Sequence, residues 1–116
     1  MNSLIETIFT DFQVDGVSIP VSFLRYNGKS ITYVTYMHYD SANSFSGDDE
    51  LLGYVDYYDF DIYSKGNYLN IVESIKQLLK QNGFMFQPSR TSPDMYEDDT
   101  GYYHKTLSFA IEKEEE

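Results

Sequence analysis

The sequence predicts one α+β domain, with a mostly antiparallel four- to five-stranded sheet and two amphipathic helices packed on one face. A chain of 116 residues with 41% hydrophobic side chains suits a single core. In two segments apolar residues recur at helical spacing, and in the segments around them apolar and polar residues alternate. Several short turns favour antiparallel pairing. The domain should span residues 1–116, with 113–116 as a frayed, solvated end.

The first predicted helix covers residues 3–12. Ser3 and Glu6 have the S-x-x-E spacing in which the two residues cap each other's free backbone amides. The second helix is predicted to begin after Asn67 as its cap and to end at Gly83. Each helix has one apolar stripe, formed by Leu4, Ile5, Ile8, Phe9 and Phe12 in the first and by Tyr68, Ile71, Val72, Ile75, Leu78 and Leu79 in the second.

The predicted strands are residues 17–23, 31–39, 53–64, 84–87 and 102–112. Pro20 places the first of them at a sheet edge, because proline donates no ladder hydrogen bond. Asn27-Gly28 predicts a tight hairpin from the first strand into the second. Residues 40–50 are predicted to be a long loop, and residues 88–101 a mobile excursion.

The third strand places different side chains on its two faces. Because side chains alternate along a strand, one face should be core and the other a hydrated aromatic surface. We expect the carboxylates of this second face to be solvated and to tolerate replacement by lysine. The core set is Tyr54, Tyr58, Phe60 and Ile62, and the other face carries Val55 with the candidate assembly surface of Tyr57, Asp59, Asp61 and Tyr63.

Nineteen acidic and eight basic residues give a formal charge of −11, which repels phosphate backbones and anionic lipids. Nucleic-acid binding through a basic patch is therefore not expected. The acidic clusters lack the ligand order and glycine of an EF-hand loop, so we interpret them as solvated loops and expect no metal. As candidate interaction loops they comprise Asp48, Asp49, Glu50, Asp94, Glu97, Asp98 and Asp99.

Catalytic signatures are missing from the sequence. There is no cysteine, and His38 and His104 lack H-E-x-x-H or comparable metal spacing. No G-x-S-x-G elbow or phosphate-binding glycine loop occurs. The sequence thus argues against an enzyme and implies no cofactor. No apolar run reaches the ~18 residues of a membrane span, so we expect an intracellularly made chain with no membrane partner.

Taken in order, the segments resemble the tail terminator, or tail completion, proteins of long-tailed bacteriophages. The resemblance covers nearly the whole chain. After an amphipathic first helix, ITYVTY is similar to one family strand and YDFDIYSKG to another, followed by the helix NYLNIVESIKQLLKQNGF. An acidic loop then leads to YYHKTLSFAIE, similar to the family's final strand with its Tyr-His pair.

The resemblance implies a structural virion protein, made in the bacterial cytoplasm and located in the tail. It would form a ring, usually of six copies, that caps the tail tube and meets the head completion or connector protein. DNA would be only passing cargo, and no cofactor would be needed. Two alternatives stay open: a head-side completion protein of the same joint, and a small acidic inhibitor that mimics DNA.

Overall fold

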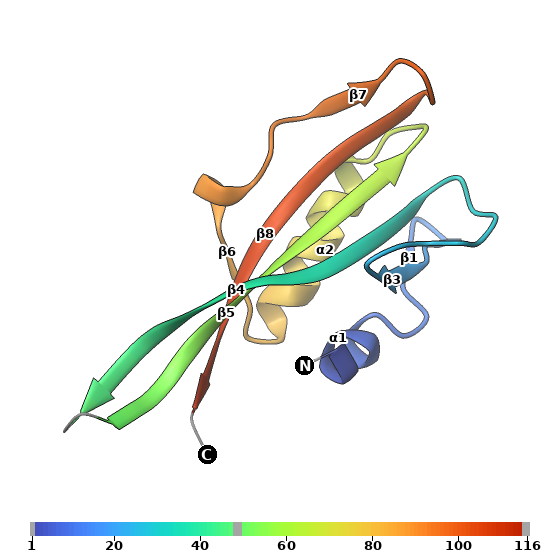
Figure 1. Ribbon diagram of the computed structural model, residues 1–116. Coiled ribbons are helices and arrows are strands. Elements are labelled where there is room, and N and C mark those ends of the chain that lie inside the picture. Colours follow the sequence, from blue (N-terminus) through green and yellow to red (C-terminus); the bar gives the residue numbers. More distant parts are fainter. Residues whose placement is uncertain (1, 48–49, 115–116) are drawn as a thin grey trace.

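The computed structural model describes residues 2–47 and 50–114 (Figure 1). The predicted α+β class with a largely antiparallel sheet is confirmed. The two α-helices are α1 (Asn2–Ile8) and α2 (Leu69–Gln81), and a 3₁₀ turn, η1, covers Pro88–Arg90. The strands are β1 (Gln13–Val14), β2 (Val17–Ser18), β3 (Val21–Phe23), β4 (Tyr33–Gly47), β5 (Glu50–Ser64), β6 (Met85–Phe86), β7 (Met95–Glu97) and β8 (Tyr102–Glu114).

The described residues contain eight strands, where four or five were expected. Six form one sheet in the order β3-β4-β5-β8-β6, with β7 also beside β8, and β1 and β2 form a separate pair. Pro20 splits the expected first strand into β2 and β3, because its ring lacks the N–H that a continuous ladder needs. The rest of the excess comes from β1 and from β7, which lies within the expected excursion.

The predicted hairpin at Asn27-Gly28 is wrong. β3 does lie at the sheet edge, but it runs parallel to β4, with Val21 opposite Val34. Residues 24–32 carry the chain back before it re-enters the sheet in the same direction. The Val34 N–H donates to the carbonyl of Pro20 at 2.9 Å, so the proline still joins the edge through its acceptor.

The predicted loop at residues 40–50 is also wrong. β4 continues to Gly47 and β5 begins at Glu50, so most of this polar segment is the end of a long hairpin. Register shifts between His38 and Asp40 and between Asn43 and Phe45 absorb the irregular sequence. The resulting arm extends beyond the helices in Figure 1, and the molecule measures 53 × 27 × 24 Å. Asp48 and Asp49 lie outside the described residues.

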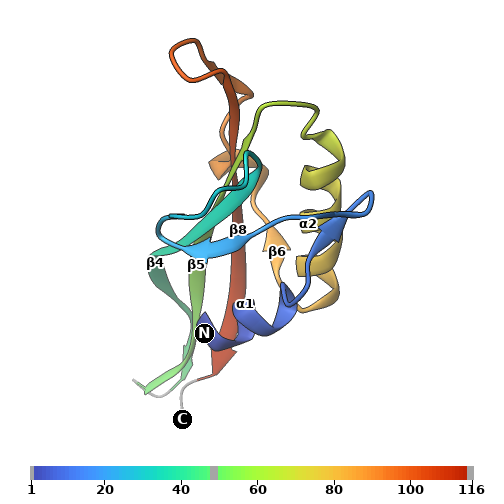
Figure 2. The same ribbon diagram turned by 90° about the vertical axis from the view of Figure 1, so that its right-hand side faces the viewer.

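The core lies between the sheet and the helices, and Figure 2 shows α1 and α2 on the same side of the sheet. Phe9 contacts Phe60 of β5 with ring centroids 5.8 Å apart, and Phe60 contacts Phe109 of β8 at 5.6 Å. The core members from the helices and their ends are Ile5, Phe9, Phe12, Tyr68, Ile71, Val72, Ile75 and Leu79, and those from β5 are Tyr58, Phe60 and Ile62. Tyr54, predicted to face the core, is only half-buried.

The helix ends agree with the sequence in part. α1 begins at Asn2, so Ser3 lies inside its first turn and its carbonyl accepts from the Thr7 hydroxyl at 2.8 Å. Asn67 does accept the Leu69 N–H at the start of α2, at 3.0 Å. Gly83 ends α2 as predicted, with a positive φ of 89° that glycine adopts at little cost. In the described part of the chain, neither helix is long and apolar enough to cross a membrane.

The segment after α2 follows the outer edge of β8. β7 pairs with the start of that strand and β6 with its middle, and Gln87 and Ser92 donate backbone hydrogen bonds to Ser108 and Thr106 at 2.8 and 2.9 Å. The predicted mobile excursion is therefore anchored at several points. η1 also lies against β8, where the Arg90 carbonyl accepts from the Ser108 hydroxyl, and it carries the Arg90 side chain over the face opposite the helices.

Candidate functional site

The sheet has one face directed away from the core, and we call it the open face. Its residues are identified by the strand register, in which Asp59 of β5 lies opposite Ser108 of β8 and Asp61 opposite Thr106. β4 contributes Tyr33, Thr35, Met37 and Tyr39, β5 contributes Tyr57, Asp59, Asp61 and Tyr63, and β8 contributes Tyr102, His104, Thr106 and Ser108. All four predicted assembly-surface residues thus lie on this face.

The two carboxylates of the open face are not freely solvated, contrary to the expectation from sequence. Asp61 accepts a hydrogen bond from the Thr106 hydroxyl, and its Oδ1 lies 3.1 Å from Nε2 of His104. The Asp61 side chain is only 22% exposed. Each carboxylate is held by the side chain opposite it on β8, so both belong to the sheet structure.

Asp59 is a partly buried carboxylate beside the hydroxyl of Ser108. Oγ of Ser108 lies 2.6 Å from Oδ1 of Asp59 and 2.9 Å from the carbonyl oxygen of Arg90. The serine has one hydroxyl proton for these two acceptors. Burial raises the pKa of Asp59 and the charge of Asp61 adds to this effect, whereas the hydrogen bond from Ser108 and the charge of Arg90 oppose it. Ser108 shares its single hydroxyl proton between the Asp59 carboxylate and the Arg90 carbonyl.

Arg90 covers one end of the open face. Its guanidinium lies 4.1 Å from the ring centroid of Tyr57 and donates to the hydroxyl of Tyr39 at 3.0 Å. A guanidinium stacked on an aromatic ring gains both cation–π and packing energy. Arg90 therefore links η1 to β5 and β4 across β8, and it is a positive group within the predicted carboxylate surface. The sequence does not reveal this role, because the polar, proline-containing segment around Arg90 is typical of a loop.

A ladder of four rings crosses the other end of the open face. Tyr26 stacks on Tyr33 at 4.8 Å, Tyr33 on Tyr63 at 4.9 Å, and Tyr63 on His104 at 4.3 Å between ring centroids. Burial raises the pKa of Tyr63 to about 12, and the charge of Asp61 adds to this effect. Because these rings stack on one another, their faces are largely occupied, and the ladder is poorly suited to stacking a flat ligand.

A Ser-His-Asp group lies on the helix side of the sheet but does not have the geometry of a catalytic relay. Nε2 of His38 lies 2.9 Å from Oγ of Ser41 and 3.3 Å from Oδ1 of Asp56, while Ser41 donates directly to Asp56 at 2.6 Å. In a relay the acid binds one ring nitrogen and the serine the other. The shared nitrogen indicates a structural cluster around the buried Asp56.

The acidic loops have different environments. Asp94 is held by Lys105 at 3.0 Å, and hydrogen bonds from Tyr68 and Lys105 lower its pKa. Glu97 accepts from Thr100 at 3.3 Å, whereas Asp98 and Asp99 are exposed in the turn between β7 and β8. Glu50 begins β5. Among the described residues, no group of three or more His, Asp or Glu side chains is arranged to hold a metal ion.

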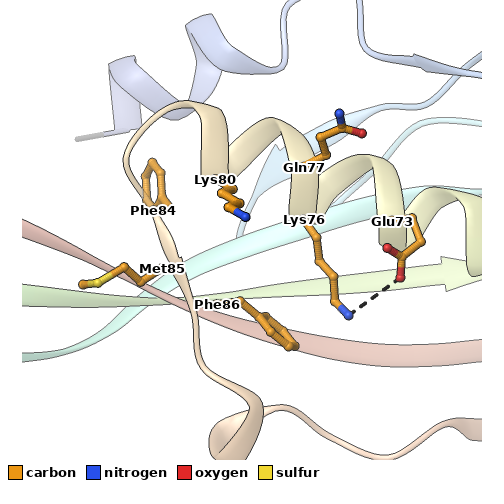
Figure 3. Close-up of a pocket in the computed structure, with 7 residues that line it drawn as sticks. All are labelled: Glu73, Lys76, Gln77, Lys80, Phe84, Met85 and Phe86. Carbon is orange, nitrogen blue, oxygen red and sulfur yellow. Dashed lines mark ion pairs between the residues drawn. The ribbon is translucent and has the colours of Figure 1, made fainter.

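A groove of about 670 Å³ lies between α2 and β6 (Figure 3). Its lining residues are Glu73, Lys76, Gln77, Lys80, Phe84, Met85 and Phe86, and we call it the lysine groove. Nζ of Lys76 lies 4.4 Å from the Phe86 ring centroid and 3.8 Å from Glu73. The only signal of the groove in the sequence is the i, i+4 spacing of Lys76 and Lys80, which places both on one helix face.

No protein-family model matches the chain, and a search of curated proteins also gave no match.

Proposed function

We propose that this chain is a structural phage or prophage protein whose copies form a ring at the head-proximal end of the tail tube. The observation that carries the proposal is the pair of open backbone edges at the arm. Within the described residues, no strand pairs with the outer edge of β4 beyond Tyr36 or with that of β8 beyond Ala110. Both edges flank the same stretch of β5, Gly53–Asp56.

Unpaired strand edges are templates for another strand, and monomeric proteins usually block them. Here each copy offers two different edges on opposite sides of one three-stranded ribbon. Pairing the β4 edge of one copy with the β8 edge of the next is a heterologous contact, which closes into a ring when the rotation between copies allows it. The arm that carries both edges extends beyond the helices (Figure 1).

The resemblance of the sequence to tail terminators supports the same role, with the tail tube protein and a head completion or connector protein as partners. In such a ring the open face can border the channel through which DNA passes. A DNA-mimicking inhibitor is favoured less, because Asp56, Asp59 and Asp61 are hydrogen-bonded within the sheet and form no exposed array of charges.

Electron microscopy of particles assembled without this chain tests the role. A tail terminator predicts filled heads accompanied by overlong or unjoined tails. Filled heads that leak DNA, with tails of normal length, would place the protein on the head side of the joint instead. If virions made without the chain were normal and infectious, the structural role would be contradicted, and the inhibitor would be the better proposal.

A further inference from the structure

We propose that the acidic turn between β7 and β8 of one copy docks into the lysine groove of a second copy. The acidic tip comprises residues 97–101 and lies at one end of the molecule in Figure 1. The inference deepens the proposed function and rests on it, since it needs copies that associate. It names a contact between them that the strand edges do not supply.

The lysine groove stands out in a chain with 19 acidic and eight basic residues. It presents two lysines and one acid, and the Lys76–Glu73 pair spans 3.8 Å with Glu73 largely exposed, so it is weak and exchangeable. None of the ion pairs among the described residues includes Lys80. Lys76 and Lys80 are separated by ~6 Å along the helix, which suits two neighbouring carboxylates.

The groove also offers apolar surface and a backbone edge. Met85 is 45% exposed, and three consecutive residues of the β6 segment line the groove, so the groove runs along the strand edge. Because Gln87 donates its N–H to Ser108, alternation along the antiparallel ladder directs the N–H and C=O of Phe86 away from β8. β6 ends the strand order, and these groups therefore face the groove side.

The acidic tip has the complementary chemistry. Asp98 and Asp99 are exposed and take part in no side-chain hydrogen bond or ion pair within the described residues. Beside them Met95 is 36%, Tyr96 54% and Tyr103 39% exposed. Carboxylates next to exposed aromatic surface fit lysines next to exposed Met85 and half-buried Phe86, so charge and apolar area match in one contact.

The tip cannot reach the groove of its own copy. β7 pairs with β8 at Tyr102–His104, and β6 pairs with it at Phe109–Ala110. At ~3.3 Å per residue, Tyr102 and Ala110 are about 26 Å apart along a strand. β5 pairs with β8 along this whole length and keeps it extended. The occupant must therefore be the tip of another copy, either reciprocally within a pair or head to tail.

Charge reversal in the full chain gives the first test, by sedimentation at about 150 mM salt, where the Debye length is ~8 Å. We expect K76E/K80E and D98K/D99K each to weaken self-association about tenfold or more. The combined variant restores complementarity and keeps the formal charge at −11, so it should associate nearly as the natural chain does. R25E/K29E changes the formal charge as K76E/K80E does, at two exposed positions outside the groove and the tip, and controls for general repulsion. Failure of the combined variant to recover would overturn the inference.

Disulfide trapping gives a second test that does not depend on affinity, because the chain has no cysteine. Mixing Q77C in the groove with T100C at the tip should yield a cross-linked pair, whereas Q77C with K29C should not. Equal yields from both mixtures would contradict the contact. If the tip–groove cross-links formed only in pairs or open chains, the contact would be supported and the ring would be contradicted. Closed rings that form equally well in the substituted chains would support the ring and contradict the tip–groove contact.

Discussion

The hydroxyl of Ser108 on β8 lies 2.6 Å from the carboxylate of Asp59 on β5, directly opposite it in the strand register. The two neighbouring strands repeat this arrangement one pair further along, where Thr106 donates to Asp61. The acidic residues of β5 are therefore partners of hydroxyl groups within the sheet. Their alternation in the sequence suggests solvated side chains, but the structure gives them a structural role. Substituting them should therefore change the stability of the fold.

Asp59→Asn should stabilise the fold at pH 7. The pKa of Asp59 is raised in the folded chain from its usual value of 3.8, so its contribution to stability is full below that value and is lost as the pH rises through the folded pKa. Asparagine avoids the burial of a charge and can donate to Ser108. The gain in free energy of unfolding, measured with urea, should vanish near pH 3.5. A gain independent of pH would contradict this account.

Asp61→Lys should destabilise the fold by about 3 kcal/mol, because it removes the acceptor for Thr106 and places a cation beside His104 in a half-buried site. This replaces the expectation from sequence that a lysine is tolerated here. Asp61→Asn keeps an acceptor and should cost less than about 1 kcal/mol. Equal thermal stability of Asp61→Lys and the natural chain would show that the carboxylate is solvated after all.

Tyr36→Phe should stabilise the fold by about 1 kcal/mol, since a buried hydroxyl without a partner carries a desolvation cost. Tyr36 is 2% exposed, and its hydroxyl has no hydrogen-bond partner among the described residues. Phenylalanine keeps the ring contacts with Phe23 and Phe60. Tyr36→Ala should instead cost about 3 kcal/mol or more through the cavity it leaves. Lower stability of Tyr36→Phe in chemical denaturation would reveal a partner for the hydroxyl.

Alkaline titration should divide the tyrosines into groups. Burial raises the pKa of Tyr58 and of Tyr63 to about 12, from a usual value of 10.0. Because the folded pKa is the higher one, these groups stabilise the fold fully below pH 10 and lose that contribution between pH 10 and 12. Phenolate absorbance at 295 nm should show a late step, and Tyr63→Phe should reduce it. A single phenolate transition near pH 10 would contradict the raised pKa values of Tyr58 and Tyr63.

Periodicity predicted well the elements whose stability comes from one apolar stripe. The stripe and the terminating Gly83 identified α2, and alternation identified Tyr58, Phe60 and Ile62 as core. These signals are local, because 3.6-residue and two-residue periods depend only on which side of one element is buried.

Properties that depend on pairing between distant segments could not be predicted in this way. The parallel course of β3 beside β4 overrides a strong hairpin signal at Asn27-Gly28. The arm at residues 40–47 and 50–57 is held by cross-strand backbone bonds, which a polar composition conceals. The partial burial of Asp59 and Asp61 follows only once β5 and β8 are in register.

Native mass measurement and electron microscopy of the purified chain, across a series of salt and magnesium concentrations, test the ring most directly. Because each copy carries a formal charge of −11, we expect monomers or small oligomers in dilute buffer, and closed rings as ionic strength rises or when tail tubes are added. A chain that stays monomeric under all these conditions, or that forms closed rings only at low salt, would contradict the account.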